Sequence, residues 1–124
     1  MATLLFSMPI RPGQADAARA FAQECVGPRL SDFDASERRI GIPVETWYMQ
    51  RIGNTEYFTV MVEGPDLNAS LGAFIASQDP FDLWFKSRLA DVTGVDLNAG
   101  PPPPEAFAET LAEYHANASV PAAS

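Results

Sequence analysis

Tyr48 and Tyr57 are the side chains whose type and setting best suit catalysis in this sequence. A phenol hydroxyl can donate a hydrogen bond to a developing oxyanion or relay a proton. Both tyrosines lie in segments rich in β-branched and aromatic residues, so packing of the two rings across neighbouring strands is the competing interpretation. With His115 they form the predicted catalytic set. The residues predicted to bind a substrate are Thr46, Gln50, Thr59, Met61 and Trp84.

Three other side chains have two interpretations each. His115 titrates near neutral pH and is a candidate general base or haem ligand, or else a solvated histidine at the end of a helix. Cys25 lies on an apolar helical stripe without a nearby histidine, which favours a packed thiol over a nucleophile. Glu45 can be a base with a raised pKa, or it can pair with a nearby arginine, for which Arg38, Arg39 and Arg11 are the candidates.

The sequence contains no motif for a metal or a cofactor. It has one histidine and one cysteine, which are far apart. Carboxylates are abundant but do not show the spacing of a calcium loop. A glycine-rich phosphate loop, a dinucleotide fingerprint and a nucleophile elbow are all lacking. We therefore expect neither a bound metal nor a cofactor.

Charge and hydropathy narrow the possible partners. The 124 residues carry a formal net charge of −8, with only 8 lysines and arginines. Binding to nucleic acid or to an anionic membrane surface requires clustered basic residues, so both are unexpected. No apolar run approaches the roughly 20 residues of a membrane span, and the first residues lack a basic leader. The sequence therefore predicts a cytoplasmic, globular protein.

The local patterns predict an α+β domain. Residues 3–8 read as a strand, residues 18–25 carry a helical stripe, and residues 29–40 continue as helix. Residues 44–52 and 55–63 form a hairpin around Gly53-Asn54. Asp66 and Asp79 are N-caps of two helices, Gly94 ends the second, and residues 95–97 are expected to form a last short strand.

This order is βαββαβ, which predicts a four-stranded antiparallel sheet with helices on one face. Residues 1–98 make up this domain. Residues 99–124 are expected to form a Pro-rich spacer, a helix with Phe107, Leu111 and Tyr114 on one side, and a frayed tail from about residue 117.

A two-residue hairpin loop places Ile52 opposite Thr55 and the opposite charges of Arg51 and Glu56 face to face. One sheet face is then mostly apolar and suits the helices. The other face carries the two tyrosines and their polar neighbours. Either a second subunit covers this face and encloses a pocket, or the face is half-exposed to water.

The pattern resembles the dimeric α/β-barrel superfamily. The residues that carry the resemblance are 4–13, the hairpin 44–64, and the segment 74–85 with its Ser-x-x-Pro-x-Asp helix start at Ser77. The chain looks most similar to an uncharacterised bacterial family related to antibiotic-biosynthesis-type monooxygenases. Glu45 and Tyr57 match that family's core. The resemblance implies a ferredoxin-like protomer that pairs its sheet with a second copy.

The predicted function follows from this resemblance and from the inferred pocket. We expect a homodimer that binds a small apolar or aromatic molecule. Its activity is expected to be that of a cofactor-independent enzyme of the monooxygenase, cyclase or isomerase type, acting on an aromatic or polyketide-like substrate. The alternative is a non-catalytic ligand-binding or protein-interaction module.

Overall fold

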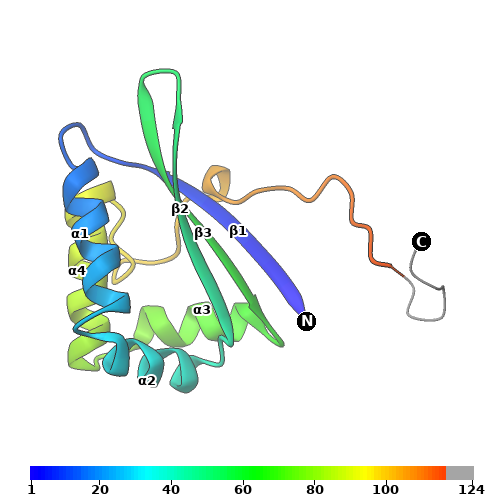
Figure 1. The fold of residues 1–124 in the computed structure, drawn as a ribbon. Coiled ribbons are helices and arrows are strands. Elements are labelled where there is room, and N and C mark those ends of the chain that lie inside the picture. Colours follow the sequence, from blue (N-terminus) through cyan, green and yellow to red (C-terminus); the bar gives the residue numbers. More distant parts are fainter. Residues whose placement is uncertain (117–124) are drawn as a thin grey trace.

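The computed structural model describes residues 1–116, and the predicted fraying of residues 117–124 lies outside this range. One three-stranded sheet packs against four helices (Figure 1). The elements are β1 (Ala2–Pro9), α1 (Ala15–Val26), α2 (Leu30–Ile40), β2 (Val44–Ile52), β3 (Thr55–Gly64), α3 (Leu67–Ala76), α4 (Pro80–Thr93) and the 3₁₀ turn η1 (Pro104–Ala106).

The sheet has the order β1-β3-β2 and is antiparallel throughout. The predicted hairpin register is confirmed, with Ile52 opposite Thr55 and Arg51 opposite Glu56. Gly53 has a φ of 62°, as the first central residue of a type II′ turn requires. Because side chains alternate along a strand, this register decides which residues of β2 and β3 face the helices.

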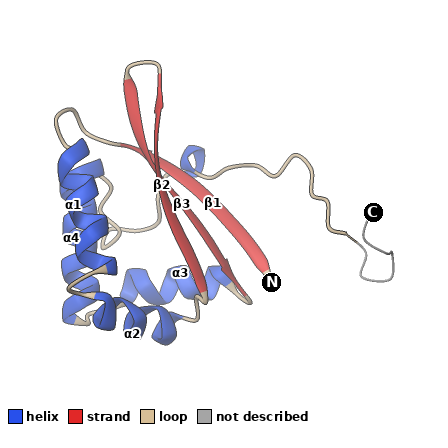
Figure 2. Cartoon of the chain, in the orientation of Figure 1, coloured by secondary structure: helices blue, strands red, loops and turns tan. Residues whose placement is uncertain are grey.

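All four α-helices lie on one side of the sheet (Figure 2). The core between the two layers contains Phe6 and Met8 of β1, Phe58 and Val60 of β3, and large aromatic side chains of the helices. Phe85 of α4 lies near the centre of this aromatic cluster. The prediction of helices on a single face is therefore confirmed.

The start of α4 is a polar cluster buried within this apolar layer. Asp79 caps the helix by accepting a hydrogen bond from the Phe81 amide at 3.0 Å. The buried Asp82 carboxylate accepts hydrogen bonds from Ser36 and Ser77 and pairs with Arg39 at 3.1 Å. The Ser-x-x-Pro-x-Asp pattern thus joins α2, α3 and α4, and its carboxylate is balanced by an arginine, as a buried charge must be.

A second buried charge, that of Lys86, lies at the C-terminal end of α3. The Lys86 ammonium donates to the backbone carbonyls of Phe74, Ile75 and Ser77 at 2.9–3.1 Å. The last carbonyls of a helix have no N–H donor within the helix, and the helix dipole favours a positive charge at this end. Burial lowers the pKa of Lys86, while Asp82 and Asp96 act in the opposite direction.

The fourth strand and the C-terminal helix predicted from sequence are both wrong within the described residues. Residues 95–97 form no strand. Instead, Phe107 bridges Phe6 of β1, and the Ala108 amide donates to the Leu5 carbonyl at 2.8 Å. Beyond this point the chain runs away from the body of the protein as far as residue 116, without helix (Figure 1).

The prolines explain this outcome. Residues 101–103 and the turn η1 lead the chain to the free edge of β1, where the backbone of residues 107–108 finds hydrogen-bond partners. The stripe that predicted a helix has nothing to pack on, since Leu111 and Tyr114 are both 89% exposed. A short helix without tertiary contacts is marginal in water. No helix in residues 1–116 combines the length and apolar character needed to cross a membrane.

Candidate functional site

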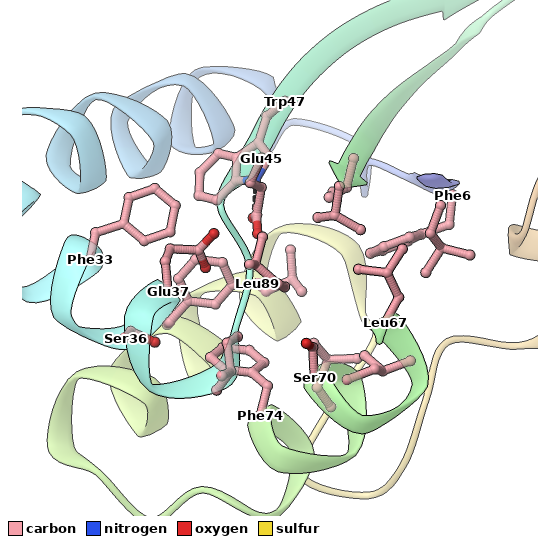
Figure 3. Close-up of a pocket in the computed structure, with 18 of the residues that line it drawn as sticks. Phe6, Phe33, Ser36, Glu37, Glu45, Trp47, Leu67, Ser70, Phe74 and Leu89 are labelled. Atoms are coloured by element: carbon pink, nitrogen blue, oxygen red, sulfur yellow. Dashed lines mark hydrogen bonds between the residues drawn. The ribbon is translucent and has the colours of Figure 1, made fainter. Parts of the chain in front are cut away.

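A small cavity lies between the sheet and the helices, at the level of α2 and α3 (Figure 3). Its volume is about 60 Å³, enough for a few water molecules or for one end of a ligand. The walls are almost entirely apolar. Their aromatic members are Phe6, Phe33, Trp47, Phe58, Phe74, Phe81 and Phe85.

Two carboxyl groups interrupt this apolar lining. Glu37 comes from α2 and Glu45 from the start of β2, and the two side chains point toward one another across the cavity (Figure 3). The Trp47 indole donates a hydrogen bond to Oε2 of Glu45 at 2.6 Å. Glu45 and Trp47 are two residues apart on one strand, so their side chains lie on the same face of the sheet.

The apolar surroundings raise the pKa of both carboxyls. Burial raises the pKa of Glu37 to about 9, helped by the charge of Glu45, by a hydrogen bond to Glu45 and by the charge of Asp82. Burial also raises the pKa of Glu45, against the opposing effect of hydrogen bonds from Trp47 and Glu37. At neutral pH Glu37 therefore keeps its proton, which it donates in a hydrogen bond to Glu45.

This arrangement provides an acid and a base side by side. Glu45, which accepts hydrogen bonds from Trp47 and Glu37, can accept a proton in its carboxylate form, and Glu37 can supply one. The combination suits proton transfer to and from carbon or oxygen in a bound molecule. The low polarity of the walls would strengthen the interaction of these charges with developing charge on a ligand.

The sequence analysis missed Glu37, although a signal for it exists. Phe33, Ser36, Glu37 and Ile40 have the spacing i, i+3, i+4 and i+7, and all four line the cavity. Two polar residues therefore occupy an otherwise apolar helical stripe. Ser36 is accounted for by its hydrogen bond to Asp82, which leaves Glu37 as the carboxyl group that faces the cavity.

The proposed ion pair of Glu45 with an arginine is not formed. Arg38 pairs with Asp34 at 2.8 Å, and Arg39 pairs with Asp79 and Asp82. Both arginines therefore have carboxylate partners other than Glu45. Glu45 is left with Trp47 and Glu37 as its partners, which favours the interpretation of Glu45 as a base.

The residues predicted around the two tyrosines lie on the opposite, outer face of the sheet. Tyr48 is 53% exposed, and Tyr57 is half-buried. Thr59, at the centre of this face, shares a hydrogen bond of 2.8 Å with Ser7. The residues that the structure gathers on this face are Thr46, Tyr48, Gln50, Tyr57, Thr59 and Met61.

Trp84 and His115 are not part of that group. Trp84 belongs to α4 in the helical layer, where the Arg29 guanidinium lies 4.1 Å from the ring centroid. His115 lies in the exposed segment after residue 107, so the predicted setting at the end of a helix is wrong for it. The structure therefore places the predicted catalytic residues in two separate regions.

Cys25 is a packed thiol, as predicted. It is fully buried on α1, and burial is the main cause that raises the pKa of its thiol to about 12. A thiol with such a pKa does not form a thiolate at neutral pH. Within residues 1–116, no three His, Cys, Asp or Glu side chains are close enough together to hold a metal ion.

Comparisons with known proteins support the fold. No protein-family model and no curated protein matches the chain. Among solved structures, the chain is similar to tetracenomycin F2 cyclase from Streptomyces glaucescens, a type-II polyketide cyclase. The TM-score is 0.57 at 14% sequence identity, and the alignment covers 94% of this chain and 100% of the cyclase. At this identity the likeness concerns the fold alone, and it agrees with the predicted ferredoxin-like arrangement.

Proposed function

We propose that this protein is a cofactor-independent enzyme that transfers protons on an enolisable, polyketide-like or aromatic ketone. The observation that carries the proposal is the pair formed by Glu37 and Glu45, two hydrogen-bonded carboxyl groups with raised pKa values that face each other in an apolar cavity. A buried pair of carboxyls whose pKa values are shifted is a common basis for acid–base catalysis. The cyclase with a similar fold acts in the same chemical class, which supports this choice.

The proposed reaction begins with Glu45. Its carboxylate removes a proton from the carbon next to a ketone, the C–H electron pair forms a C=C bond, and the C=O π pair moves to the carbonyl oxygen. Glu37 donates its proton to that oxygen, which gives a neutral enol. In an isomerisation, Glu45 returns its proton to a different carbon of a conjugated enol, and the enol hydroxyl gives its proton back to Glu37. In an aldol-type cyclisation, the enol carbon attacks a second carbonyl to form a C–C bond, and the enol hydroxyl returns its proton to Glu37 as the ketone re-forms. The new alkoxide takes the proton held by Glu45.

Deuterium exchange tests this core step without knowledge of the natural substrate. The probe is 2-tetralone, a fused-ring ketone with acidic protons next to its carbonyl, dissolved in D₂O and followed by proton NMR. We expect the protein to accelerate loss of the α-proton signal above the buffer rate. Binding of the probe without acceleration would contradict the proposal and favour the alternative, a non-catalytic ligand-binding protein.

The double variant Tyr48→Phe/Tyr57→Phe tests which face of the sheet carries the catalytic residues. Both phenols lie across the sheet from the cavity, so the carboxyl pair predicts that exchange stays within about twofold of wild type, a change worth only some 0.4 kcal/mol. The same NMR assay measures the rate. Loss of exchange in this variant would move the catalytic site to the outer face, where the tyrosines were predicted to act.

We also propose that a second copy of the chain covers the outer face, giving a homodimer with paired sheets. Helices cover only the opposite face, and the outer face carries Leu5, Met61 and Tyr48 among polar neighbours. An amphipathic sheet face with large side chains is typical of packing against another sheet. This pairing is the arrangement that the superfamily resemblance implies.

Met61→Arg tests the pairing, because it places a charge on the central strand of this face. We expect native mass spectrometry to find two chains for the wild type and one for the variant, since an unpaired buried charge opposes association. Val26→Arg is the control, because Val26 is 60% exposed on α1 in the helical layer. A wild-type monomer, or a variant that remains dimeric, would refute the proposed interface.

A further inference from the structure

The cavity that holds the carboxyl pair adjoins a second, larger hollow. This outer groove lies between α2 and the start of β2 and has a volume of about 690 Å³. Four residues line both hollows, namely Phe33, Glu37, Ile42 and Glu45. The carboxyl pair therefore stands at the junction, with the enclosed cavity on one side and the open groove on the other.

The two hollows differ in chemistry as well as in size. The inner cavity is walled by apolar side chains apart from the pair and two serines, Ser36 and Ser70, each engaged in a hydrogen bond. The groove combines apolar and charged side chains. Those that belong to the groove alone include Met1, Leu30, Asp34, Arg38, Pro43 and Pro65.

Size determines how a ligand can occupy the two spaces. At about 60 Å³ the inner cavity accepts only a small apolar end, such as a methyl group with part of a ring. A molecule with its carbonyl between the carboxyls must then leave its remaining atoms in the groove. The charged pair formed by Arg38 and Asp34, with its nitrogen and oxygen 2.8 Å apart, would lie beside the polar groups of that outer part.

We infer that the substrate is an elongated, multi-ring ketone that enters through the outer groove, places a small apolar end in the inner cavity and leaves its larger part in the groove. This inference rests on the proposed function for the position of the carbonyl between Glu37 and Glu45. It adds a binding subsite, the groove formed by α2 and β2, and a direction of entry. The groove, and not the cavity, then selects substrates by length.

A series of methyl ketones tests the subsite. Acetophenone, 2-acetylnaphthalene and 2-acetylanthracene share the reacting group and differ only in the number of rings that the groove must hold. Each added ring buries roughly 50 Å² of apolar surface, so we expect about tenfold tighter binding per ring, measured by calorimetry. Affinity that is unchanged or falls with added rings would overturn the inference.

Leu30→Asp and Val26→Asp form a matched pair for the same measurement. Leu30 is 52% exposed at the mouth of the groove, whereas Val26 is 60% exposed outside the residues that line it. An acid in the first turn of α2 suits a helix N-terminus, so the Leu30 variant should fold. We expect Leu30→Asp to remove most of the gain from added rings, while Val26→Asp changes neither that gain nor acetophenone binding. An unaltered gain in Leu30→Asp would place the larger part of the ligand elsewhere.

Failure of this inference is distinguishable from failure of the proposed function. Calorimetry reports where the ligand lies, and deuterium exchange reports whether the pair transfers protons. A ring series without any gain, combined with exchange that depends on Glu45, would refute the groove and leave the proposed function standing. A gain with each added ring, combined with exchange that does not depend on Glu45, would confirm the groove as a binding subsite and refute the catalytic role of the pair.

Discussion

Replacement of Glu45 by glutamine is expected to lower α-proton exchange of 2-tetralone by about a hundredfold or more, which is the usual contribution of a general base. Glutamine keeps the size of the side chain, and its amide oxygen can still accept the Trp47 indole hydrogen bond. The amide cannot accept a proton from carbon, however. The variant therefore removes the proposed chemistry and keeps the shape of the cavity.

Glu56→Gln is the matched control for this experiment. Glu56 is on β3, on the same face of the sheet as Glu45, but it lies opposite Arg51 at the hairpin end and outside the cavity lining. We expect the Glu56→Gln variant to exchange the α-protons of 2-tetralone at the wild-type rate. Equal rates for Glu45→Gln and wild type, with both proteins folded by circular dichroism, would exclude Glu45 as the base.

Glu37→Gln is expected to change how stability depends on pH. The pKa of Glu37 rises from an ordinary value near 4.5 to about 9 on folding, so between these values the folded protein binds more protons than the unfolded chain. Stability then falls as pH rises through this window, by at most about 1.4 kcal/mol per pH unit for one group. Below the unfolded pKa the protonated group adds no such slope. Glutamine cannot titrate and removes this contribution.

Urea denaturation at pH 5 and pH 8 measures the effect. We expect the wild type to lose more stability than Glu37→Gln between these two values, so that the variant becomes relatively more stable at pH 8. Glu45 and Asp82 face Glu37 and are present in both proteins, so the difference between the curves reports the titration of the pair that position 37 forms with Glu45. Parallel curves for the two proteins would show that Glu37 titrates alike in the folded and unfolded states.

The hairpin and its register could be predicted because local chemistry determines them. Gly53 supplies the positive φ that the turn needs, and the two-residue loop sets the pairing of the strands, which places Arg51 opposite Glu56. Asp66, Asp79 and Gly94 likewise mark helix ends through contacts with residues only a few positions away. Such signals depend on neighbouring residues and can be read without knowledge of the tertiary fold.

The pairing of Glu37 with Glu45 could not be predicted in the same way, because the two residues meet only when α2 packs on the sheet. The arginines near Glu45 were interpreted as its partners by their distance in sequence. The structure directs Arg39 to Asp82, which is 43 residues away. The choice between an ion pair and a shared proton therefore depended on side-chain directions that no local pattern reveals.

The C-terminal segment shows the opposite failure, in which a local pattern was followed too far. Phe107, Leu111 and Tyr114 have helical spacing, but a stripe forms a helix only if a surface receives it. The edge of β1 offered backbone hydrogen bonds to residues 107–108 instead. The spacing of the apolar residues alone could not show that pairing with the edge of β1 would be more favourable than a helix without tertiary contacts.

That same contact has a consequence for how the protein behaves at high concentration. An open strand edge is a template on which another chain can add, and proteins that leave long edges bare are prone to aggregate. By lying along β1 at Leu5 and Phe6, residues 107–108 cover part of one of the two edges of the sheet. The proline-rich run thus protects the sheet against aggregation, because it brings the chain to an edge at which another chain could otherwise add as a strand.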